Sequence, residues 1–300
     1  MKPEASSEKY SPPAYTDVAL VVITYNPSEQ CVQNIADASR QFCKCFVADN
    51  SDPHAQALSY LRETSHIEII SNNENLGLAA ALNELANMAL ERGFAWIVTT
   101  DQDTLLLPNF LQEMLSSKNP YPANLAAVGC NYRHDAKARS RFKPSPQPLF
   151  KEKATVITSG CLTNLGAWKT IGGFNTDFFI DAIDHEFCLR LRKAGFAVGL
   201  NPRVLMHHEI GENSDSKYRS YFVSPHQHPS WRNYTSARNT TYTMRHHFPR
   251  EARWCLKRSL SLTLELVAIF IFADKKIERA RAFFKGIRHG WAGKLEGVAI

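Results

Sequence analysis

The segment Trp96–Thr100, together with the acidic triplet that follows it, constrains the fold of this chain most. A short run of apolar and β-branched residues without charge predicts a buried strand. Asp101 and Asp103 come directly after it, and side chains at positions i and i+2 of an extended segment face the same side. Paired carboxylates suit Mg²⁺ or Mn²⁺, which keep positions open for substrate phosphates. The triplet therefore predicts a metal–diphosphate site, with a solvated turn as the alternative.

Three earlier segments have the same form as this one. Apolar strands are predicted at residues 18–24, 45–48 and 67–70, and helices at about 28–40, 55–64 and 78–92. Alternating strands and helices predict a mostly parallel sheet with helices on both faces, and ligands bind beyond the C-terminal strand edges of such sheets. Two of these edges carry Thr24-Tyr25-Asn26 and Asp49-Asn50-Ser51. Taken alone, the second triplet is also typical of a simple turn.

The length and the cysteines limit the class of protein. Three hundred residues with 44% hydrophobic content can bury one large core or two modest ones. The seven cysteines contain no CxxC pair, so a reducing, cytoplasmic setting is expected. Residues 1–16 are polar and rich in Pro and Ser, which predicts a loose leader and not a signal peptide. The first strand is not followed by GxGxxG, which argues against a dinucleotide enzyme.

The chain combines the triplets TYN (24–26), DNS (49–51) and DQD (101–103) with the spaced series Asn75, Gly77, Ala79, Ala81 and Asn83. In these residues it resembles the family-two glycosyltransferases, whose nucleotide-sugar domain has the GT-A fold. The resemblance implies that Thr24, Tyr25, Asn26 and Asp49 contact the nucleoside of the donor. It also implies that Asp101 and Asp103 hold a divalent cation, Mg²⁺ or Mn²⁺, on the diphosphate, and that they serve the ribose, so that Asp101 also counts among the nucleotide-sugar residues. The remaining residues expected on the nucleotide-sugar side are Asn50, Asn75, Gly77, Asn83, Gln102 and Arg238. For Asn75, a helix cap is the alternative, and for Arg238, an ordinary surface arginine.

The middle of the chain resembles one branch of this family in particular. A helix is predicted at residues 105–115, strands at 126–131 and 154–159, and a loop at 132–150. Residues 178–195 (FFIDAIDHEFCLRLRKAG), with TSGCL at 158–162, look like the rhamnosyltransferase branch of the family. That branch uses dTDP-rhamnose and extends bacterial surface polysaccharides such as O-antigen. The residues expected on the acceptor side are Ser159, Gly160, Asp181 and Glu186.

Asp184 is the candidate catalytic base. Helical spacing from this residue onward places it at or near a helix N-terminus, where its ionised form is favoured. Transfer with inversion needs one base to take the proton of the acceptor hydroxyl. An ordinary helix cap is the alternative for Asp184. Glu186 orients the acceptor or pairs with Arg190, four residues further on.

A histidine is expected to complete the metal shell. The family's HxxG segment matches His208 and Gly211, with His207 as an open alternative. The metal set implied by the resemblance is therefore Asp101, Asp103 and His208.

The last fifty residues are basic. From Arg250 to Ile300 eleven Lys and Arg face five Asp and Glu, an excess of six that equals the net charge of the chain, +6. The apolar run 260–273 is too short to span a bilayer, and we favour a helix over a strand there. Basic and apolar residues together predict attachment to the inner face of the plasma membrane, where a lipid-linked acceptor would lie. A core-covering or dimer-forming role is the alternative, and no nucleic-acid motif is present.

The sequence therefore predicts three parts. They are a leader (1–16), a GT-A domain (17–245, with the nucleotide-sugar half at 17–104 and the acceptor half at 105–245) and a basic, apolar helical tail (246–300). The resemblance implies a metal-dependent, inverting transfer of rhamnose from dTDP-rhamnose to a saccharide acceptor. A UDP-hexose donor, or a module that binds nucleotide sugar or membrane without catalysis, are the alternatives.

Overall fold

Packing divides the chain into two compact units. The computed structural model describes residues 12–53, 55–116, 118–133, 140–144, 150–208 and 229–295. The first unit comprises 1–75, 81–173 and 190–209, and the second 76–80, 174–189 and 210–300. These units do not follow the functional boundaries predicted above, which remain a prediction.

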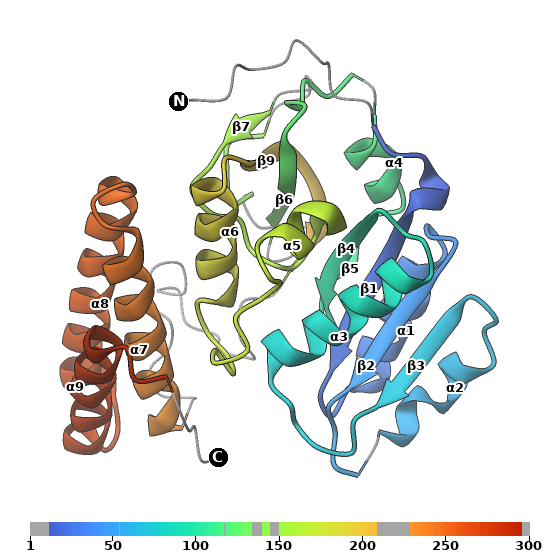
Figure 1. Ribbon diagram of the computed structural model, residues 1–300. Coiled ribbons are helices and arrows are strands. Elements are labelled where there is room, and N and C mark those ends of the chain that lie inside the picture. Colours follow the sequence, from blue (N-terminus) through green and yellow to red (C-terminus); the bar gives the residue numbers. More distant parts are fainter. Residues whose placement is uncertain are drawn as a thin grey trace. The chain divides into compact units, whose positions relative to one another are not determined.

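The first unit is built on one mixed sheet (Figure 1). Four neighbouring strands, in the order β3-β2-β1-β4, are parallel. The order continues with β8, β6, β9 and β5, where β8 runs antiparallel to both β4 and β6, while β7 pairs with β9. The strands are β1 (Val18–Thr24), β2 (Cys45–Asp49), β3 (Ile67–Ser71), β4 (Trp96–Asp101), β5 (Leu105–Leu106), β6 (Leu125–Arg133), β7 (Lys151–Glu152), β8 (Cys161–Asn164) and β9 (Ala197–His207). The central sheet of an α/β fold expected from the sequence is confirmed, but only its first four strands and the β6–β9 pair are parallel, whereas the pairs β4–β8, β6–β8, β5–β9 and β7–β9 are antiparallel.

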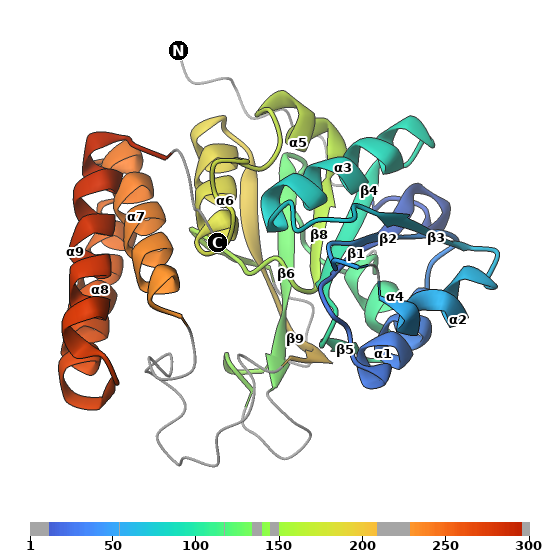
Figure 2. The ribbon, with the colours of Figure 1, turned by 90° about the horizontal axis from the view of Figure 1, so that it is seen from below.

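Helices cover both faces of this sheet. Alternate residues of β1, such as Leu20 and Val22, belong to a buried apolar cluster with Ile35 of α1, Leu61 of α2 and Phe110 of α4. α3 and α5 lie on the opposite face (Figure 2). The helices of this unit are η1 (Tyr15–Asp17), α1 (Glu29–Ser39), η2 (Gln56–Leu58), α2 (Ser59–Arg62), α3 (Leu78–Glu91), α4 (Phe110–Met114) and α5 (Leu165–Thr170). Most of α6 (Ile183–Lys193) belongs to the second unit.

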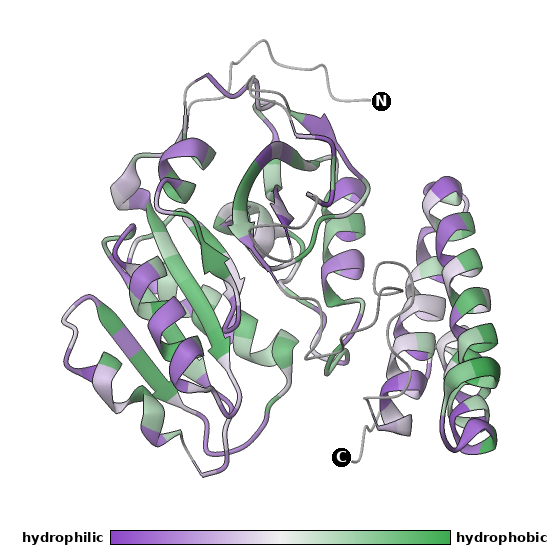
Figure 3. Cartoon of the chain, turned by 180° about the vertical axis from the view of Figure 1, so that it is seen from behind, coloured by the Kyte–Doolittle hydropathy of each residue, from purple (hydrophilic) through white to green (hydrophobic). Residues whose placement is uncertain are grey.

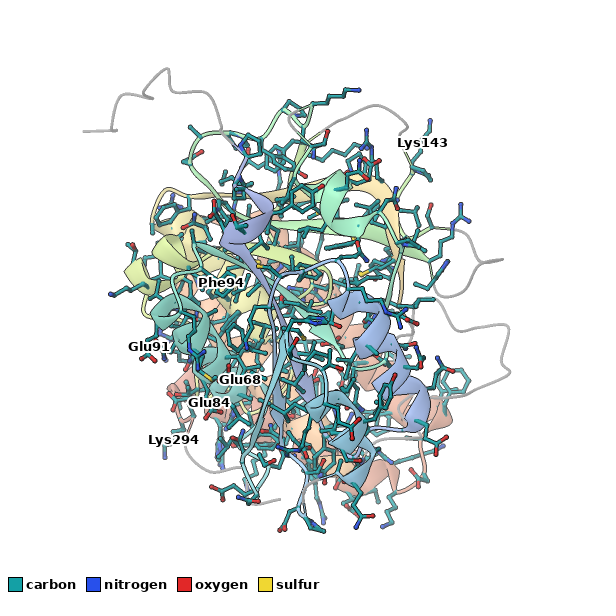
Figure 4. The ribbon with its side chains drawn as sticks, turned by 90° about the vertical axis from the view of Figure 1, so that its right-hand side faces the viewer. Glu68, Glu84, Glu91, Phe94, Lys143 and Lys294 are labelled. Carbon is teal, nitrogen blue, oxygen red and sulfur yellow. The ribbon has the colours of Figure 1, made fainter. Side chains whose placement is uncertain are left out.

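The outermost parallel strand, β3, carries charge. Glu68 accepts from Lys44 Nζ at 3.1 Å and from Arg92 Nη2 at 2.9 Å (Figure 4). Nearby, the ring of Phe94 meets that of Phe46 edge-on at 6.0 Å. A charged, ion-paired edge discourages pairing with a strand of another chain.

The parallel register brings the predicted polar edges together. Thr24 pairs with Asp49, and Ile23 pairs with Asp101. The triplets that follow β1, β2 and β4 therefore leave the sheet at one edge, as the sequence predicts.

Three predicted elements differ in the structure. The helix expected at 105–115 begins only at Phe110, because Leu105 and Leu106 pair antiparallel with His207 and Met206. The strand expected at 154–159 is wrong: the strand, β8, begins at Cys161 and pairs with β4. The helix expected at 55–64 is a 3₁₀ turn followed by one short α-helix.

The second unit contains the C-terminal helices α7 (Ser230–His247), α8 (Ala252–Phe272) and α9 (Lys276–Ala292). A helix and not a strand therefore contains the apolar run 260–273 up to Phe272, as favoured above. α9 approaches α7 closely, since a β-carbon at Gly286 or Gly290 would clash with the carbonyl oxygens of Tyr234 and Arg238. Within the described part of the chain, every helix is too short or too polar to cross a bilayer.

Some expectations fall outside the described residues. These are most of the leader, part of the loop 132–150, and Gly211 of the HxxG segment.

Candidate functional site

The acidic triplet forms a tight turn at the end of β4. Asp101 is the last residue of the strand, and the backbone N–H of Thr104 donates to the Asp101 carbonyl at 3.1 Å. Gln102 holds the chain after β1, because its Oε1 accepts from the Tyr25 N–H at 2.8 Å and its Nε2 donates to the Tyr25 carbonyl at 3.2 Å. Gln102 thus fixes the turn to the end of β1, a role that its predicted place on the nucleotide-sugar side did not include.

Asp101, Asp103 and His208 come together. One ligand atom from each lies within 4.8 Å of the others. His208 Nε2 is 3.8 Å from Asp101 Oδ2, and His208 Nδ1 is 3.9 Å from Asp103 Oδ1. Two carboxylates and an imidazole fit a divalent cation that keeps open positions for phosphate oxygens. The predicted metal set is brought together, and His208 is the histidine in the cluster.

The His208 ring is held from several sides. Its Nδ1 lies 2.8 Å from Thr104 Oγ1, its ring meets Tyr132 edge-on at 5.7 Å, and its backbone N–H donates to the Arg133 carbonyl at 2.9 Å. The side chain is 11% exposed. Its orientation is therefore fixed by the protein before any cation binds.

Ser159 and Gly160 lie behind the acidic turn. Ser159 is 1% exposed, and its Oγ lies 2.7 Å from Thr104 Oγ1 and accepts from the Asp101 N–H at 3.1 Å. Gly160 is buried and donates its N–H to the Thr99 carbonyl at 2.8 Å. Both residues therefore support the acidic turn, and the contact with the acceptor that is expected for them stays a prediction.

The residues predicted for the nucleoside form a bonded cluster at the ends of β1 and β2. Asp49 is fully buried and accepts from Thr24 Oγ1 at 3.3 Å, from the Ser51 N–H at 3.1 Å and from the Ala55 N–H at 2.8 Å. Asn50 Nδ2 donates to Asn75 Oδ1 at 3.4 Å. These bonds show that Asp49 organises a turn at the predicted edge of the sheet. A turn at this place is compatible with the nucleoside contact expected for Asp49.

Tyr25 and Asn26 extend beyond that edge. The Tyr25 side chain is 52% exposed, so its ring is available to a ligand. Asn26 has φ of 46°, in the left-handed region that asparagine tolerates better than most residues, and its N–H donates to Ser51 Oγ at 2.7 Å.

Gly77 and Asn83 have structural contacts in α3 and just before it. Gly77 has φ of 81°, and a β-carbon there would lie 2.8 Å from the Phe179 carbonyl oxygen. Asn83 Oδ1 accepts from Trp168 Nε1 at 3.2 Å. These contacts do not test the donor-binding role that is expected for Gly77 and Asn83, so that role stays a prediction.

In the second unit, Asp184 lies in the first turn of α6, as the sequence predicts. Its side chain is 19% exposed, and its Oδ1 accepts from the His185 N–H at 2.8 Å. Burial lowers the pKa of His185, an effect that the Asp184 carboxylate partly offsets. Glu186 is 4% exposed, which does not fit direct contact with an acceptor from the solvent side.

The residues before α6 are fastened to α7. Asp181 and Ala182 both have left-handed φ, 67° and 59°. The Asp181 carboxylate accepts from Arg232 Nη2 at 2.9 Å and from Thr235 Oγ1 at 3.1 Å. Asn239 Nδ2 donates to the carbonyls of Ile180 and Asp181 at 2.8 and 3.0 Å. Asp181 therefore shapes the segment that leads to Asp184, and the acceptor contact expected for it stays a prediction.

Arg238 needs a correction. The residue is fully buried, and its guanidinium donates to Asn239 Oδ1 at 2.9 Å, to the Leu295 carbonyl at 2.7 Å and to the Asp177 carbonyl at 3.0 Å. A cation enclosed in this way has no surface for a diphosphate, and it is not an ordinary surface arginine either. Its structural role is to join α7 to the chain on both sides of it.

Three further residues had no predicted role. Thr104 contacts His208, while Arg232 and Thr235 hold Asp181. Thr104 follows the acidic triplet directly, which was the available signal. Arg232 and Thr235 are more than fifty residues from Asp181 along the chain, and no sequence pattern connects them.

Comparisons with known proteins identify the family. Residues 19–178 match the sequence profile of the family described as "Glycosyl transferase family 2". A relative from Shigella flexneri, the "dTDP-rhamnosyl transferase RfbF", is 26% identical over 212 residues, which cover 66% of this chain and 71% of the relative.

A solved structure, "GalNAc-T7 with UDP, GalNAc and Mn2+", has a TM-score of 0.54 at 9% identity. The match covers 76% of this chain and spans about half, 48%, of that structure, so it concerns the fold alone. The family match covers more than half of the chain and includes the acidic turn, whereas Asp184 lies beyond it. The chain is a glycosyltransferase with the GT-A type of fold, and it belongs to glycosyl transferase family 2.

Proposed function

We propose that this glycosyltransferase moves L-rhamnose, with inversion, from dTDP-rhamnose to a saccharide acceptor in the synthesis of a bacterial surface polysaccharide. The observation that carries the proposal is the Asp101–Asp103–His208 cluster at the carboxyl edge of the sheet. The named activity of the Shigella flexneri relative supports dTDP-rhamnose as the donor.

The reaction balances with one base. The acceptor hydroxyl oxygen forms a bond to the anomeric carbon as the bond from that carbon to the diphosphate breaks. Asp184 takes the hydroxyl proton, and dTDP leaves with the electron pair of the broken bond. The assignment of Asp184 rests on the resemblance and on its place in the first turn of α6.

Asp101, Asp103 and His208 would hold Mg²⁺ or Mn²⁺, which offsets the charge of the departing diphosphate. The imidazole in this set favours Mn²⁺ over Mg²⁺, because Mg²⁺ prefers oxygen ligands. On the nucleoside side, the exposed ring of Tyr25 and the Thr24–Asp49 pair line the donor edge in this proposal.

The proposal is tested by calorimetric titration of the purified protein with dTDP and with UDP, each with and without Mn²⁺. We expect dTDP to bind more tightly than UDP and to need Mn²⁺. A preference for UDP would keep the transferase and overturn the rhamnose assignment. Binding of neither nucleotide with Mn²⁺ would contradict the metal-dependent site.

We further propose that the acceptor is lipid-linked and that α8 and α9 contact the inner leaflet. Exposed apolar side chains lie at spacings of three and four residues along α8, at Leu256, Leu260, Leu264, Val267 and Ile271. Apolar stretches are seen on these helices in Figure 3. On α9 the exposed residues alternate between apolar and basic, in the order Ile277, Arg281, Phe284, Arg288 and Trp291. The membrane is a better partner for this surface than a second copy of the chain, because dimer formation here would bring two basic tails together.

Vesicle co-sedimentation tests this contact. We expect the protein to bind phosphatidylglycerol vesicles more tightly than phosphatidylcholine vesicles, and less tightly as salt is raised. Leu260→Asp should weaken binding about tenfold or more, because burying one leucine is worth about 1.5–3 kcal/mol. Tyr60→Asp is the matched control, as this side chain is 62% exposed on α2. Equal binding of the two variants would rule out α8 as the membrane face.

A further inference from the structure

A row of hydroxyl groups runs from His208 to the strand that carries Asp101. His208 Nδ1 lies 2.8 Å from Thr104 Oγ1, and Thr104 Oγ1 lies 2.7 Å from Ser159 Oγ. Ser159 Oγ lies 3.3 Å from Thr100 Oγ1, which donates to the Asp101 carbonyl at 3.5 Å. Thr100, Thr104 and Ser159 are each 4% exposed or less. Solvent therefore does not replace the members of this row.

The hydroxyl groups of this row can donate in more than one direction. The distances allow either member of each hydroxyl pair to donate, and they allow either nitrogen of His208 to carry the proton. In one arrangement Thr100 donates to the Asp101 carbonyl, Ser159 donates to Thr100, Thr104 donates to Ser159, and the Nδ1–H of His208 donates to Thr104. Ser159 also accepts the Asp101 N–H in this arrangement. This arrangement satisfies all four side chains and leaves Nε2 of His208 without a proton.

A neutral imidazole that is protonated on Nδ1 has its lone pair on Nε2. Nε2 lies 3.8 Å from Asp101 Oδ2, whereas Nδ1, which lies 3.9 Å from Asp103 Oδ1, is also 2.8 Å from the Thr104 hydroxyl, so Nε2 is the nitrogen left open to a cation. A divalent cation needs that unprotonated nitrogen, and it needs the ring held still.

We infer that Thr104 and Ser159 are positioning residues that select the His208 tautomer with Nε2 free for the cation. This role rests on the proposed metal site, and it explains why a buried serine and threonine stand directly behind the acidic turn. Because the same row ends on the backbone of Asp101, it couples the position of the histidine to that of one carboxylate.

The first test is the affinity for Mn²⁺ itself, measured by electron paramagnetic resonance of free Mn²⁺ with dTDP present. Thr104→Val should weaken Mn²⁺ binding by about 10- to 100-fold, the range found when outer partners of metal ligands are removed. Thr104→Ser keeps the hydroxyl and should restore affinity near that of the wild type. Thr163→Val is the matched control, since Thr163 is 1% exposed on β8 and its hydroxyl lies near Cys161 Sγ, away from this row. Equal affinity of Thr104→Val and wild type would overturn the inference.

The second test needs no metal. In ¹⁵N-labelled protein, long-range proton–nitrogen spectra of neutral His208 should show the proton on Nδ1. In Thr104→Val the signal should move toward the Nε2–H form, which is the commoner form without a partner. If the wild type binds no Mn²⁺, the proposed metal site fails. If His208 carries its proton on Nε2 in the wild type, the positioning role fails, whatever the metal result.

Discussion

Asp184→Asn is expected to lower kcat for sugar transfer by about 10²- to 10⁴-fold, the usual contribution of a general base. The amide has nearly the shape of the carboxylate and can still accept the His185 N–H, so the start of α6 should keep its structure. What it cannot do is take the proton of the acceptor hydroxyl. Affinity for dTDP and Mn²⁺ should stay within about twofold, because Asp184 has no part in the proposed metal set.

The measurement is initial-rate kinetics with saturating donor, alongside titration of the same variant with dTDP. Asp177→Asn is a suitable control, because its side chain is exposed in the segment that leads to α6. An Asp184→Asn variant with the kcat of the wild type would remove Asp184 as the base. Loss of dTDP binding in this variant would instead indicate a structural role.

Asp103→Ala is expected to abolish the dependence of dTDP binding on Mn²⁺. Asp103 is the more exposed of the two carboxylates, 48% against 39% for the side chain of Asp101, so its removal should disturb the turn least. Loss of a direct ligand should reduce Mn²⁺ affinity by more than the roughly 10- to 100-fold expected for outer partners.

Calorimetry with and without Mn²⁺ checks this result, and Asp37→Ala serves as the control. Asp37 is also an exposed aspartate, but it pairs with Arg40 on α1. If Asp103→Ala still bound dTDP more tightly with Mn²⁺ than without it, the cation would have to lie elsewhere.

The nucleotide half of the fold could be predicted from the sequence because its strands are continuous apolar runs. Val18–Thr24 and Trp96–Asp101 are buried on both faces of the sheet, so burial itself produces the pattern. The carboxyl edge then follows from parallel pairing, which brings Thr24, Asp49 and Asp101 together without further information.

The acceptor half could not be predicted in the same way. Leu105 and Leu106 suit a helix equally well, and only their pairing with the distant β9 makes them a strand. In the same region, Thr158 and Ser159 look like the end of a strand, although their polar groups serve the neighbouring turn. Local propensity is overridden by partners more than fifty residues away.

Side-chain roles were the least predictable. The sequence does not distinguish a buried structural arginine such as Arg238 from an arginine that binds a diphosphate. The difference lies in the two carbonyl oxygens and one amide oxygen that accept from Arg238 after folding. The bonds from Ser159 to Thr104 and Asp101 were not predictable either, because a buried hydroxyl and an exposed one have the same sequence signal.

The two-residue strand β5 has a consequence for the choice between two adjacent histidines. Leu105 pairs with His207, so a short ladder joins the chain just after Asp103 to the chain just before His208. Successive residues of a strand point to opposite faces, and a slip of one residue would exchange them. Insertion of a single residue in β9 before His207 would therefore bring His207 to the place of His208 at the acidic turn and move His208 away from it.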